Sequence, residues 1–290
     1  MWLILLAGCD QVFGLTGRDD EPSDRDDGGM IIVDGADASS VCPVHSDPLG
    51  DDDDDSIPNQ SDLCPVTFDR GNNEDGDCFA DACDLCPHLR DDVSDVDLDG
   101  IGDACDFPGN TVDARIFEGF DNADELHLFN MEIDHSRAQL RNSTAGPSFG
   151  FSNQPLPPTF WIETRFEIPT SPAAWNFGLI FGAVMPGEKP MGWAVTISSF
   201  TASEMRARLH RISNGAFVAQ SYERGFVATG SVRLGVRVEA GVISVITTVG
   251  QTTNTEAADT MPIGPQQPTY WGVTTNGGLG AFDYMTALHH

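Results

Sequence analysis

Carboxylates and cysteines recur at fixed spacing between Asp51 and Asp106. The most regular copy runs from Asp95 to Asp106 and reads D-V-D-L-D-G-I-G-D-A-C-D. Acidic side chains stand at alternate positions, a glycine follows, and two more aspartates complete the segment. A hard cation such as Ca²⁺ takes about six to eight oxygen ligands, and glycine permits the sharp bend that brings them together. The segment therefore predicts a calcium-binding loop.

Two earlier segments, 51–65 and 73–87, fit the same frame, and each ends in Cys-Pro. An internal repeat of this kind is typical of an array in which each unit packs against its neighbours. Ser56 and Cys78 stand where the frame expects glycine, and Asn59 and Asn73 replace aspartates, so the affinity of these two loops is less secure than that of the third. The predicted calcium ligands are Asp51, Asp53, Asp55, Asn59, Asp62, Asn73, Asp75, Asp77, Asp81, Asp84, Asp95, Asp97, Asp99, Asp103 and Asp106.

The three copies resemble thrombospondin type 3 repeats. The resemblance rests on the acidic positions together with the Cys-x-x-Cys-Pro segment at 83–87. It implies calcium-binding loops that are stapled by disulfides and contain little helix or sheet. A disordered acidic linker is the plain alternative, but a mere charge run would not keep cysteines in register with carboxylates. An EF-hand or dockerin needs a helix after the loop, and 105–109 (C-D-F-P-G) is a poor helix.

Six of the seven cysteines lie in the repeats or just before them, as in an exported protein. Cys64 and Cys83 are 19 positions apart, as are Cys86 and Cys105, and we predict both pairs as disulfides. Cys42 and Cys78 are then left to each other. Many pairings are possible in principle, so the equal spacing is an indication only. The surrounding aspartates argue against a zinc or redox site at the Cys-x-x-Cys.

The seventh cysteine, Cys9, ends the sequence L-A-G-C after an apolar run. This resembles a bacterial lipobox, although the positive n-region of a signal peptide is missing. The resemblance implies that residues 1–8 are the remainder of a signal peptide and that Cys9 is lipidated. We therefore expect a lipid-anchored protein of the cell envelope, at the outer membrane or cell surface. Residues 9–41 lack an apolar period and are predicted to be a flexible acidic tether.

The charge is concentrated in the N-terminal part. Residues 9–112 contain 29 acidic and 4 basic side chains, whereas residues 113–290 contain 16 and 11. Nucleic acid is an implausible partner, because such a chain offers no basic face to phosphates. Divalent cations are the natural counterions. Without them we expect the repeat region, residues 42–110, to swell by self-repulsion.

Residues 111–290 have the composition of a packed β domain. In the segment 160–168, Phe160, Ile162 and Phe166 alternate with Glu163 and Arg165. Many short strand-like segments, separated by turn formers and without a helical period, predict a mainly β chain with a two-sheet antiparallel jelly-roll sandwich. The predicted strands are 116–120, 126–133, 160–168, 177–184, 192–199, 205–212, 217–222, 231–239, 242–249, 270–275 and 281–288.

The order of the segments F-W-I-E (160–163), F-G-L-I-F (177–181) and Y-W-G-V (270–273) resembles concanavalin A-like and laminin G-like domains. Some glycosidases share that fold and place three acids in a Glu-x-Asp-x-Glu pattern. The nearest match here, Glu132-Ile-Asp134, has Ser136 in place of the third acid, so we expect no catalysis there. The G-x-S-x-G match around Ser148 reads as a loop and not as a nucleophile elbow.

Three functions are compatible with this organisation. We favour a non-enzymatic lipoprotein whose calcium-rigidified spacer presents a lectin-like sandwich for adhesion or glycan binding. Trp161, on the polar side of its strand, is the candidate ligand-binding residue. The alternatives are a polysaccharide-degrading enzyme of the same fold and an envelope module that docks other proteins.

Overall fold

The computed structural model describes residues 47–68, 71–90, 94–106, 114–120, 123, 126–144, 146–169, 175–184, 189–199, 204–261, 269–277 and 281–289. These residues belong to one compact unit. Cys9, Cys42, the predicted signal peptide (residues 1–8) and the predicted tether (residues 9–41) lie outside the described residues. Among the described residues, no helix is long and apolar enough to cross a membrane.

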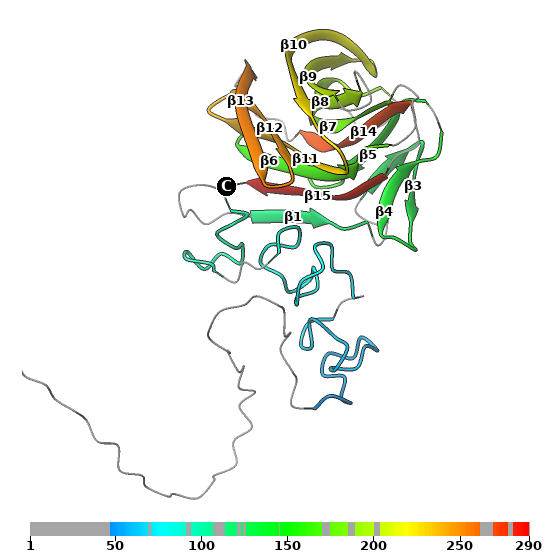
Figure 1. Cartoon of the computed structure of the whole chain (residues 1–290), viewed down its shortest axis with the longest axis vertical. Helices are drawn as coiled ribbons and strands as arrows, with labels where there is room; N and C mark the ends of the chain where they lie inside the picture. Colours follow the sequence, from blue (N-terminus) through cyan, green and yellow to red (C-terminus); the bar gives the residue numbers. More distant parts are fainter. Residues whose placement is uncertain are drawn as a thin grey trace, which may run out of the picture. The chain divides into compact units, whose positions relative to one another are not determined.

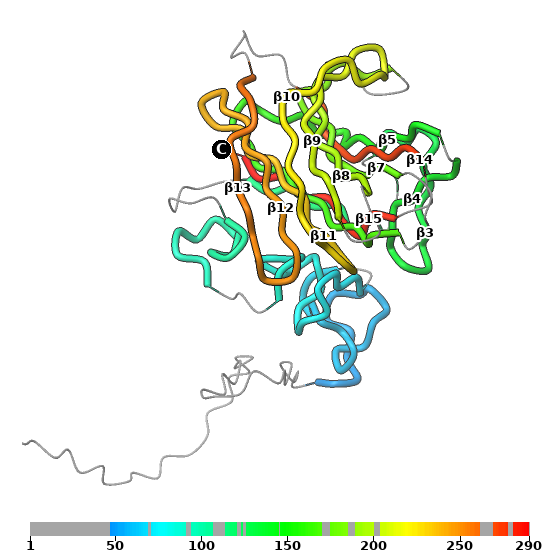
Figure 2. Tube along the Cα trace, turned by 45° about the horizontal axis from the view of Figure 1, so that its top comes forward, coloured from blue at the N-terminus to red at the C-terminus, as the bar shows by residue number. Residues whose placement is uncertain are grey.

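The predicted two-sheet antiparallel sandwich is confirmed. One sheet has eight strands in the order β13-β12-β11-β6-β15-β4-β3, with β1 also paired to β15, and the other has seven in the order β10-β9-β8-β7-β14-β5-β2 (Figure 1). Figure 2 shows β11, β12 and β13 running side by side along one sheet. The strands are β1 Ala114–Glu118, β2 Leu126–Phe129, β3 Met131–Asp134, β4 Gln139–Asn142, β5 Ser148–Ser152, β6 Phe160–Glu167, β7 Trp175–Ala183, β8 Gly192–Ser199, β9 Glu204–Ser213, β10 Ala216–Val227, β11 Ser231–Glu239, β12 Val242–Val249, β13 Thr252–Thr260, β14 Tyr270–Gly277 and β15 Ala281–His289.

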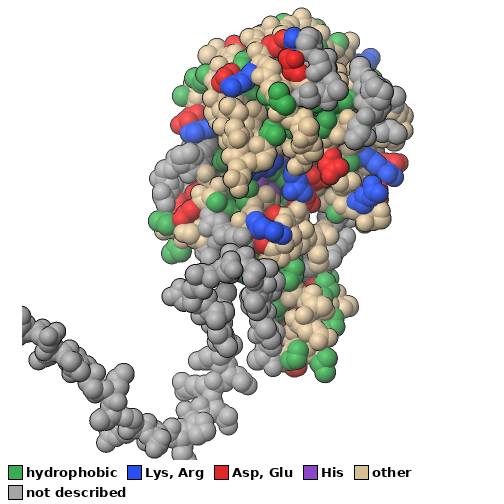
Figure 3. All heavy atoms as spheres, viewed as in Figure 1, with side chains coloured by type: hydrophobic (Ala, Val, Ile, Leu, Met, Phe, Trp, Pro, Cys, Tyr) green, Lys and Arg blue, Asp and Glu red, His purple; other side chains and the backbone are tan. Residues whose placement is uncertain are grey.

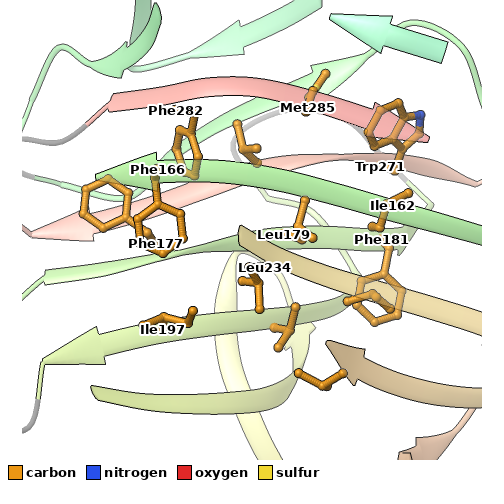
Figure 4. Close-up of a cluster of buried hydrophobic side chains, with 14 of the residues drawn as sticks. Ile162, Phe166, Phe177, Leu179, Phe181, Ile197, Leu234, Trp271, Phe282 and Met285 are labelled. Carbon is orange, nitrogen blue, oxygen red and sulfur yellow. The ribbon is translucent and has the colours of Figure 1, made fainter. Parts of the chain in front are cut away.

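The core lies between the two sheets and is built from the inward faces of the alternating strands. Phe166 on β6 stacks on Phe177 of β7 at 5.1 Å, and Phe282 of β15 meets Phe177 edge-on at 5.4 Å (Figure 4). Trp271 is fully buried in the same core and donates its indole N–H to the carbonyl oxygen of Gln154. In β6 and β11 the apolar residues that alternation predicts for the core are buried.

Two sequence expectations are corrected here. The segment 126–133 is not one strand, because Asn130 takes a positive φ of 55° and divides it into β2 of one sheet and β3 of the other. The segment around Ser148 is not a loop. It forms β5, which pairs with β14 and β2, and no helix follows it, so a nucleophile elbow is absent there.

Candidate metal centres and their docking on the sandwich

The repeats consist of turns and bends, with no helix or strand among the described residues between 47 and 106. Disulfides join Cys64 to Cys83 and Cys86 to Cys105, the two pairs predicted from their spacing, with Cα atoms 5.7 and 5.8 Å apart. Cys78 is also disulfide-bonded. Disulfides persist in oxidising compartments, so the protein belongs outside a reducing cytosol.

Each repeat gathers three carboxylates. In the first and third loops they are the first three acids of the frame, Asp51, Asp53 and Asp55, and Asp95, Asp97 and Asp99. In the second loop they are Asp75, Asp77 and Asp84, because Asn73 replaces the first acid. Within each group one oxygen per residue lies within 4.8 Å of the others. Two oxygens that bind one Ca²⁺ at about 2.4 Å lie at most about 4.8 Å apart, so each group fits a single ion.

Backbone N–H groups hold these carboxylates in place, at equivalent positions of the frame. Asp55, Asp77 and Asp99 each accept a bond from the N–H two residues later, at 2.7 to 2.8 Å. The frame also needs a left-handed residue before the third acid, supplied by Asp54, Gly76 and Leu98 with φ of 63°, 72° and 64°. Main-chain hydrogen bonds therefore fix the shape of the loops, and some carboxylate oxygens accept none of these bonds.

The carboxylate oxygens that accept no hydrogen bond are buried. The Oδ2 atoms of Asp53, Asp75 and Asp97, which occupy the same position in the three loops, accept no hydrogen bond, and neither does Oδ2 of Asp84. Burial raises the pKa of all four carboxyls, that of Asp84 to about 7. Buried carboxylate oxygens without partners are costly unless a cation pairs with them. The donor set fits Ca²⁺, a hard cation that prefers oxygen ligands.

The other predicted ligands are not members of the triads, and most of them accept hydrogen bonds from the main chain of the loops. Asn59, Asp81 and Asp103 each accept the N–H of the residue after the first frame position, at 2.9 to 3.2 Å. Asp62 is buried and accepts the N–H of Cys64, and Asn73 accepts the N–H of Gly76. Asp106 is described but belongs to none of the three triads.

The second and third repeats cover the outer face of the eight-stranded sheet. On β6 and β15 the side chains of Glu163, Tyr284 and Leu288 alternate with core residues and so point away from the sandwich interior, yet they are 4%, 0% and 4% exposed. Leu288 and Trp161 join an apolar cluster with Cys86, Ile101, Cys105 and Leu89 of the repeats. Trp161 therefore lies on the polar side of β6 as predicted, but it is half-buried against the third repeat and is not an open aromatic platform.

Two arginines of the sandwich bind the second repeat. Arg115 on β1 donates to the carbonyl oxygens of Leu85 at 2.5 Å and Asp84 at 3.0 Å. Arg165 on β6 donates to Asp283 at 2.8 Å and forms an ion pair with Glu74, whose carbonyl oxygen it also reaches at 3.2 Å. Arg115 thus binds the main chain of Asp84, a candidate calcium ligand. Arg165 binds Glu74, which is the residue before the candidate ligand Asp75.

A cluster of buried polar side chains lies at the centre of the contact between the second repeat and the sandwich. The hydroxyl of Tyr284 donates to Glu163 at 2.6 Å, and the ring of His88 lies 5.1 Å from that of Tyr284. Burial and the nearby guanidinium groups of Arg233, Arg115 and Arg165 lower the pKa of His88 to about 3, so the imidazole is neutral. Its Nε2 lies 3.8 Å from Glu163 and its Nδ1 accepts no bond, which fits a neutral ring.

Sequence reasoning missed this contact. Glu163 and Arg165 alternate with apolar residues in the way that predicts a solvent-facing side, and nothing local in the sequence marks that side as covered. The sequence feature that points to it is the concentration of arginine in a domain that follows an acidic array. Charge complementarity of that kind indicates a contact without placing it.

A shallow groove of about 360 Å³ lies at the β3–β4 hairpin and the start of β15. Both acids of the predicted near-match to a glycosidase motif line it, and both are bound by Arg141, Glu132 at 3.1 Å and Asp134 at 3.0 Å. The hydrogen bonds from Ser136, and to a lesser extent the charge of Arg141, lower the pKa of Asp134. The remaining lining residues are Arg137, Gln139, Asn142, Ser143 and Ala281.

No protein-family model matches this chain, and no curated protein matches it. Solved structures with a similar β-sandwich include GH43B of the Bacteroides ovatus xyloglucan locus, which is 12% identical over 59% of this chain with a TM-score of 0.44. Its match spans only 38% of that chain. The VIP36 exoplasmic/lumenal domain in a Ca²⁺/Man3GlcNAc-bound form is 8% identical over 60% of this chain and 87% of its own, with a TM-score of 0.43. The CBM2 module of the evolved Dit of Lactobacillus casei BL23 phage J-1 is 10% identical over 61% and 96%, with a TM-score of 0.45. These likenesses concern the type of β-sandwich and transfer no residue role.

Proposed function

We propose that this chain is a calcium-binding protein of the cell envelope that uses its β-sandwich for adhesion or glycan binding. One observation carries the calcium part. A loop of the same design occurs three times, and each copy brings three carboxylates together with a buried oxygen that accepts no hydrogen bond. The resemblance to thrombospondin type 3 repeats and the disulfides that link successive repeats support this proposal.

Calcium binding is tested by native mass spectrometry and calorimetry of the disulfide-intact protein. We expect three Ca²⁺ ions per chain, one for each triad. Asp53→Asn, Asp75→Asn and Asp97→Asn should each remove one ion. Asp54→Asn is the matched control, because Asp54 lies within the first loop but outside its triad, and it should leave the stoichiometry unchanged. A protein that binds no Ca²⁺ in millimolar excess would refute the proposal.

The ligand of the sandwich is proposed to be a glycan. The groove at the β3–β4 hairpin supports this, since the half-exposed side chains of Glu132 and Arg141 in its lining carry planar polar groups of the kind that bind sugar hydroxyls. On the face seen in Figure 3, acidic and basic side chains lie side by side over the sandwich, which suits a neutral ligand better than a strongly charged one. The ion pairs of both groove acids with Arg141 support a binding role over a hydrolytic one.

Glycan binding is tested by co-sedimentation with a panel of insoluble polysaccharides, in Ca²⁺ and in EDTA. Retention that is lost on Arg141→Met but kept on Arg224→Met would place the ligand at the groove. Retention on no polysaccharide would move the sandwich to protein docking, the other envelope role that this fold can serve. Anchoring through a lipidated Cys9 is part of the proposal and is tested by metabolic labelling with a fatty acid, with Cys9→Ser as the control.

A further inference from the structure

The outer face of the eight-stranded sheet is a built interface and not a chance contact. Tyr284 and Glu163 are almost fully buried there, although they point away from the core. An uncompensated buried carboxylate would be costly, but Glu163 has the Tyr284 hydroxyl at 2.6 Å and the Arg233 guanidinium at 3.6 Å. The sheet face is therefore complete only when the second repeat covers it.

The contacts from this face end on the second calcium loop. Arg115 binds the carbonyl oxygen of Asp84, whose own carboxylate belongs to the triad, and Arg165 binds Glu74, one residue before Asp75. Asp84 is 5% exposed and its Oδ2 atom accepts no hydrogen bond, so the triad is aimed at an ion. The loop also approaches β1 closely, since a methyl group added to Gly119 would lie 3.0 Å from the carboxylate of Asp81.

The second loop departs from the frame in its first ligand and, unlike the other two loops, in the backbone at the position of the glycine. Asn73 removes one carboxylate, and Cys78 replaces the glycine that the third loop uses at φ 88°. A loop with fewer charged ligands and a less suitable backbone needs support from elsewhere to present its oxygens in one arrangement. The two arginines provide that support, because each fixes main-chain carbonyl groups of the loop.

We propose that Arg115 and Arg165 are positioning residues for the second calcium site, and that calcium binding there and covering of the sheet face form a single coupled equilibrium. This inference rests on the proposed calcium function. The coupling is reciprocal: the docked loop binds Ca²⁺ more tightly, and bound Ca²⁺ keeps the loop docked. Removing Ca²⁺ from the second loop then uncovers Tyr284 while the sandwich stays folded.

The sign of one affinity change tests the positioning role. In an Asp55→Asn, Asp99→Asn background only the second triad is intact. A guanidinium that acted through charge alone would repel Ca²⁺, so Arg115→Met would strengthen binding. If Arg115 positions the loop, Arg115→Met weakens binding by about tenfold, within the usual range of coupling between sites. Arg115→Lys should weaken it as well, since one ammonium cannot reproduce the two fixed carbonyl contacts.

Arg224→Met is the control for a lost arginine, because Arg224 pairs with Glu256 between β10 and β13 and contacts neither Asp84 nor Glu74 in the described interactions. It should leave calcium affinity unchanged. Tighter binding in Arg115→Met, or equal weakening in Arg224→Met, would overturn the proposal.

Oxidative footprinting tests the covering directly. In Ca²⁺ we expect Tyr284 to be protected, and in EDTA its oxidation should rise toward that of Phe217, which is 42% exposed. Trp271, fully buried between the sheets, should stay protected in both. Asp77→Asn should expose Tyr284 in Ca²⁺, and the equivalent Asp55→Asn of the first loop should not.

The outcomes separate the two proposals. Three ions bound, with Tyr284 protected in EDTA as well as in Ca²⁺, would keep the calcium function and overturn the coupling. Exposure of Trp271 together with Tyr284 would also overturn it, because the whole sandwich would then depend on the ion. No bound Ca²⁺ would refute both.

Discussion

The buried histidine at the centre of the repeat–sandwich contact predicts a specific loss of stability in acid. His88 is 7% exposed and its pKa is lowered to about 3. In the unfolded chain its pKa is about 6.5. The unfolded state therefore binds a proton at a pH where the folded state does not. Stability from the neutral ring is fully present above pH 6.5 and is lost progressively as the pH falls toward 3.

At pH 5, about 1.5 units below the pKa of His88 in the unfolded chain, proton uptake by the unfolded state lowers the free energy of unfolding by roughly 2 kcal/mol. The assay is urea unfolding of the disulfide-intact protein at pH 7 and pH 5 in saturating Ca²⁺. Other groups titrate as well, so the quantity that matters is a difference between variants. Wild type should lose about 2 kcal/mol more than His88→Gln, which cannot take up the proton. His127→Gln, at an exposed histidine, should behave as wild type.

An opposite result would refute this reasoning. If His88 were held as an ion pair with Glu163, its pKa would be raised and acidification would stabilise the folded state. His88→Gln would then lose more stability than wild type between pH 7 and pH 5. The 3.8 Å separation from Glu163, which already has Tyr284 and Arg233 as partners, argues for the neutral ring.

Three further predictions concern the framework. Gly178→Ala would place a methyl group against the carbonyl oxygen of Val195 on β8 and should cost on the order of 1–3 kcal/mol in urea unfolding, whereas Gly146→Ala, with its nearest atom at 3.8 Å, should cost far less. Cys86→Ser with Cys105→Ser should cost about 3 kcal/mol, the value expected for closing a loop of this size, and an unchanged midpoint would contradict it. Trp161→Ala should speed amide exchange in the third repeat, while Phe217→Ala, at an exposed site, should not.

Much of the sandwich could be predicted because polar and apolar residues alternate along its strands. The ranges predicted for 192–199, 231–239 and 242–249 match β8, β11 and β12 residue for residue. Three strands were missed. β4 and β5 are short, with little room for a pattern, and β13 reads T-T-N-T-E-A-A-D-T, a polar strand at the sheet edge. An edge strand made almost wholly of polar residues has no hydrophobic period to detect.

The calcium loops could be predicted because a local frame places their ligands. The structure groups nine of the predicted side chains in three triads, and the frame alone accounts for two of them. The second triad differs, with Asp84 in addition to Asp75 and Asp77, because the first-position residue, Asn73, has no carboxylate. The contact of the repeats with the sheet could not be predicted, since it joins residues as far apart in sequence as Glu74 and Arg165.

The choice of arginine over lysine explains why the acidic array docks at one place on the sandwich. The sequence contains a single lysine, Lys189, so nearly all of its positive charge is carried by guanidinium groups. A general attraction between an acidic segment and a less acidic domain would be satisfied by many arrangements and would weaken in salt. A planar guanidinium instead binds several acceptors in fixed directions. Arg165 holds Asp283 of its own domain and Glu74 of the repeat together, and Arg115 takes two consecutive carbonyl oxygens. Docking that depends on these directions, and not on net charge, should persist at salt concentrations that screen the rest of the array, provided that the second loop holds its ion.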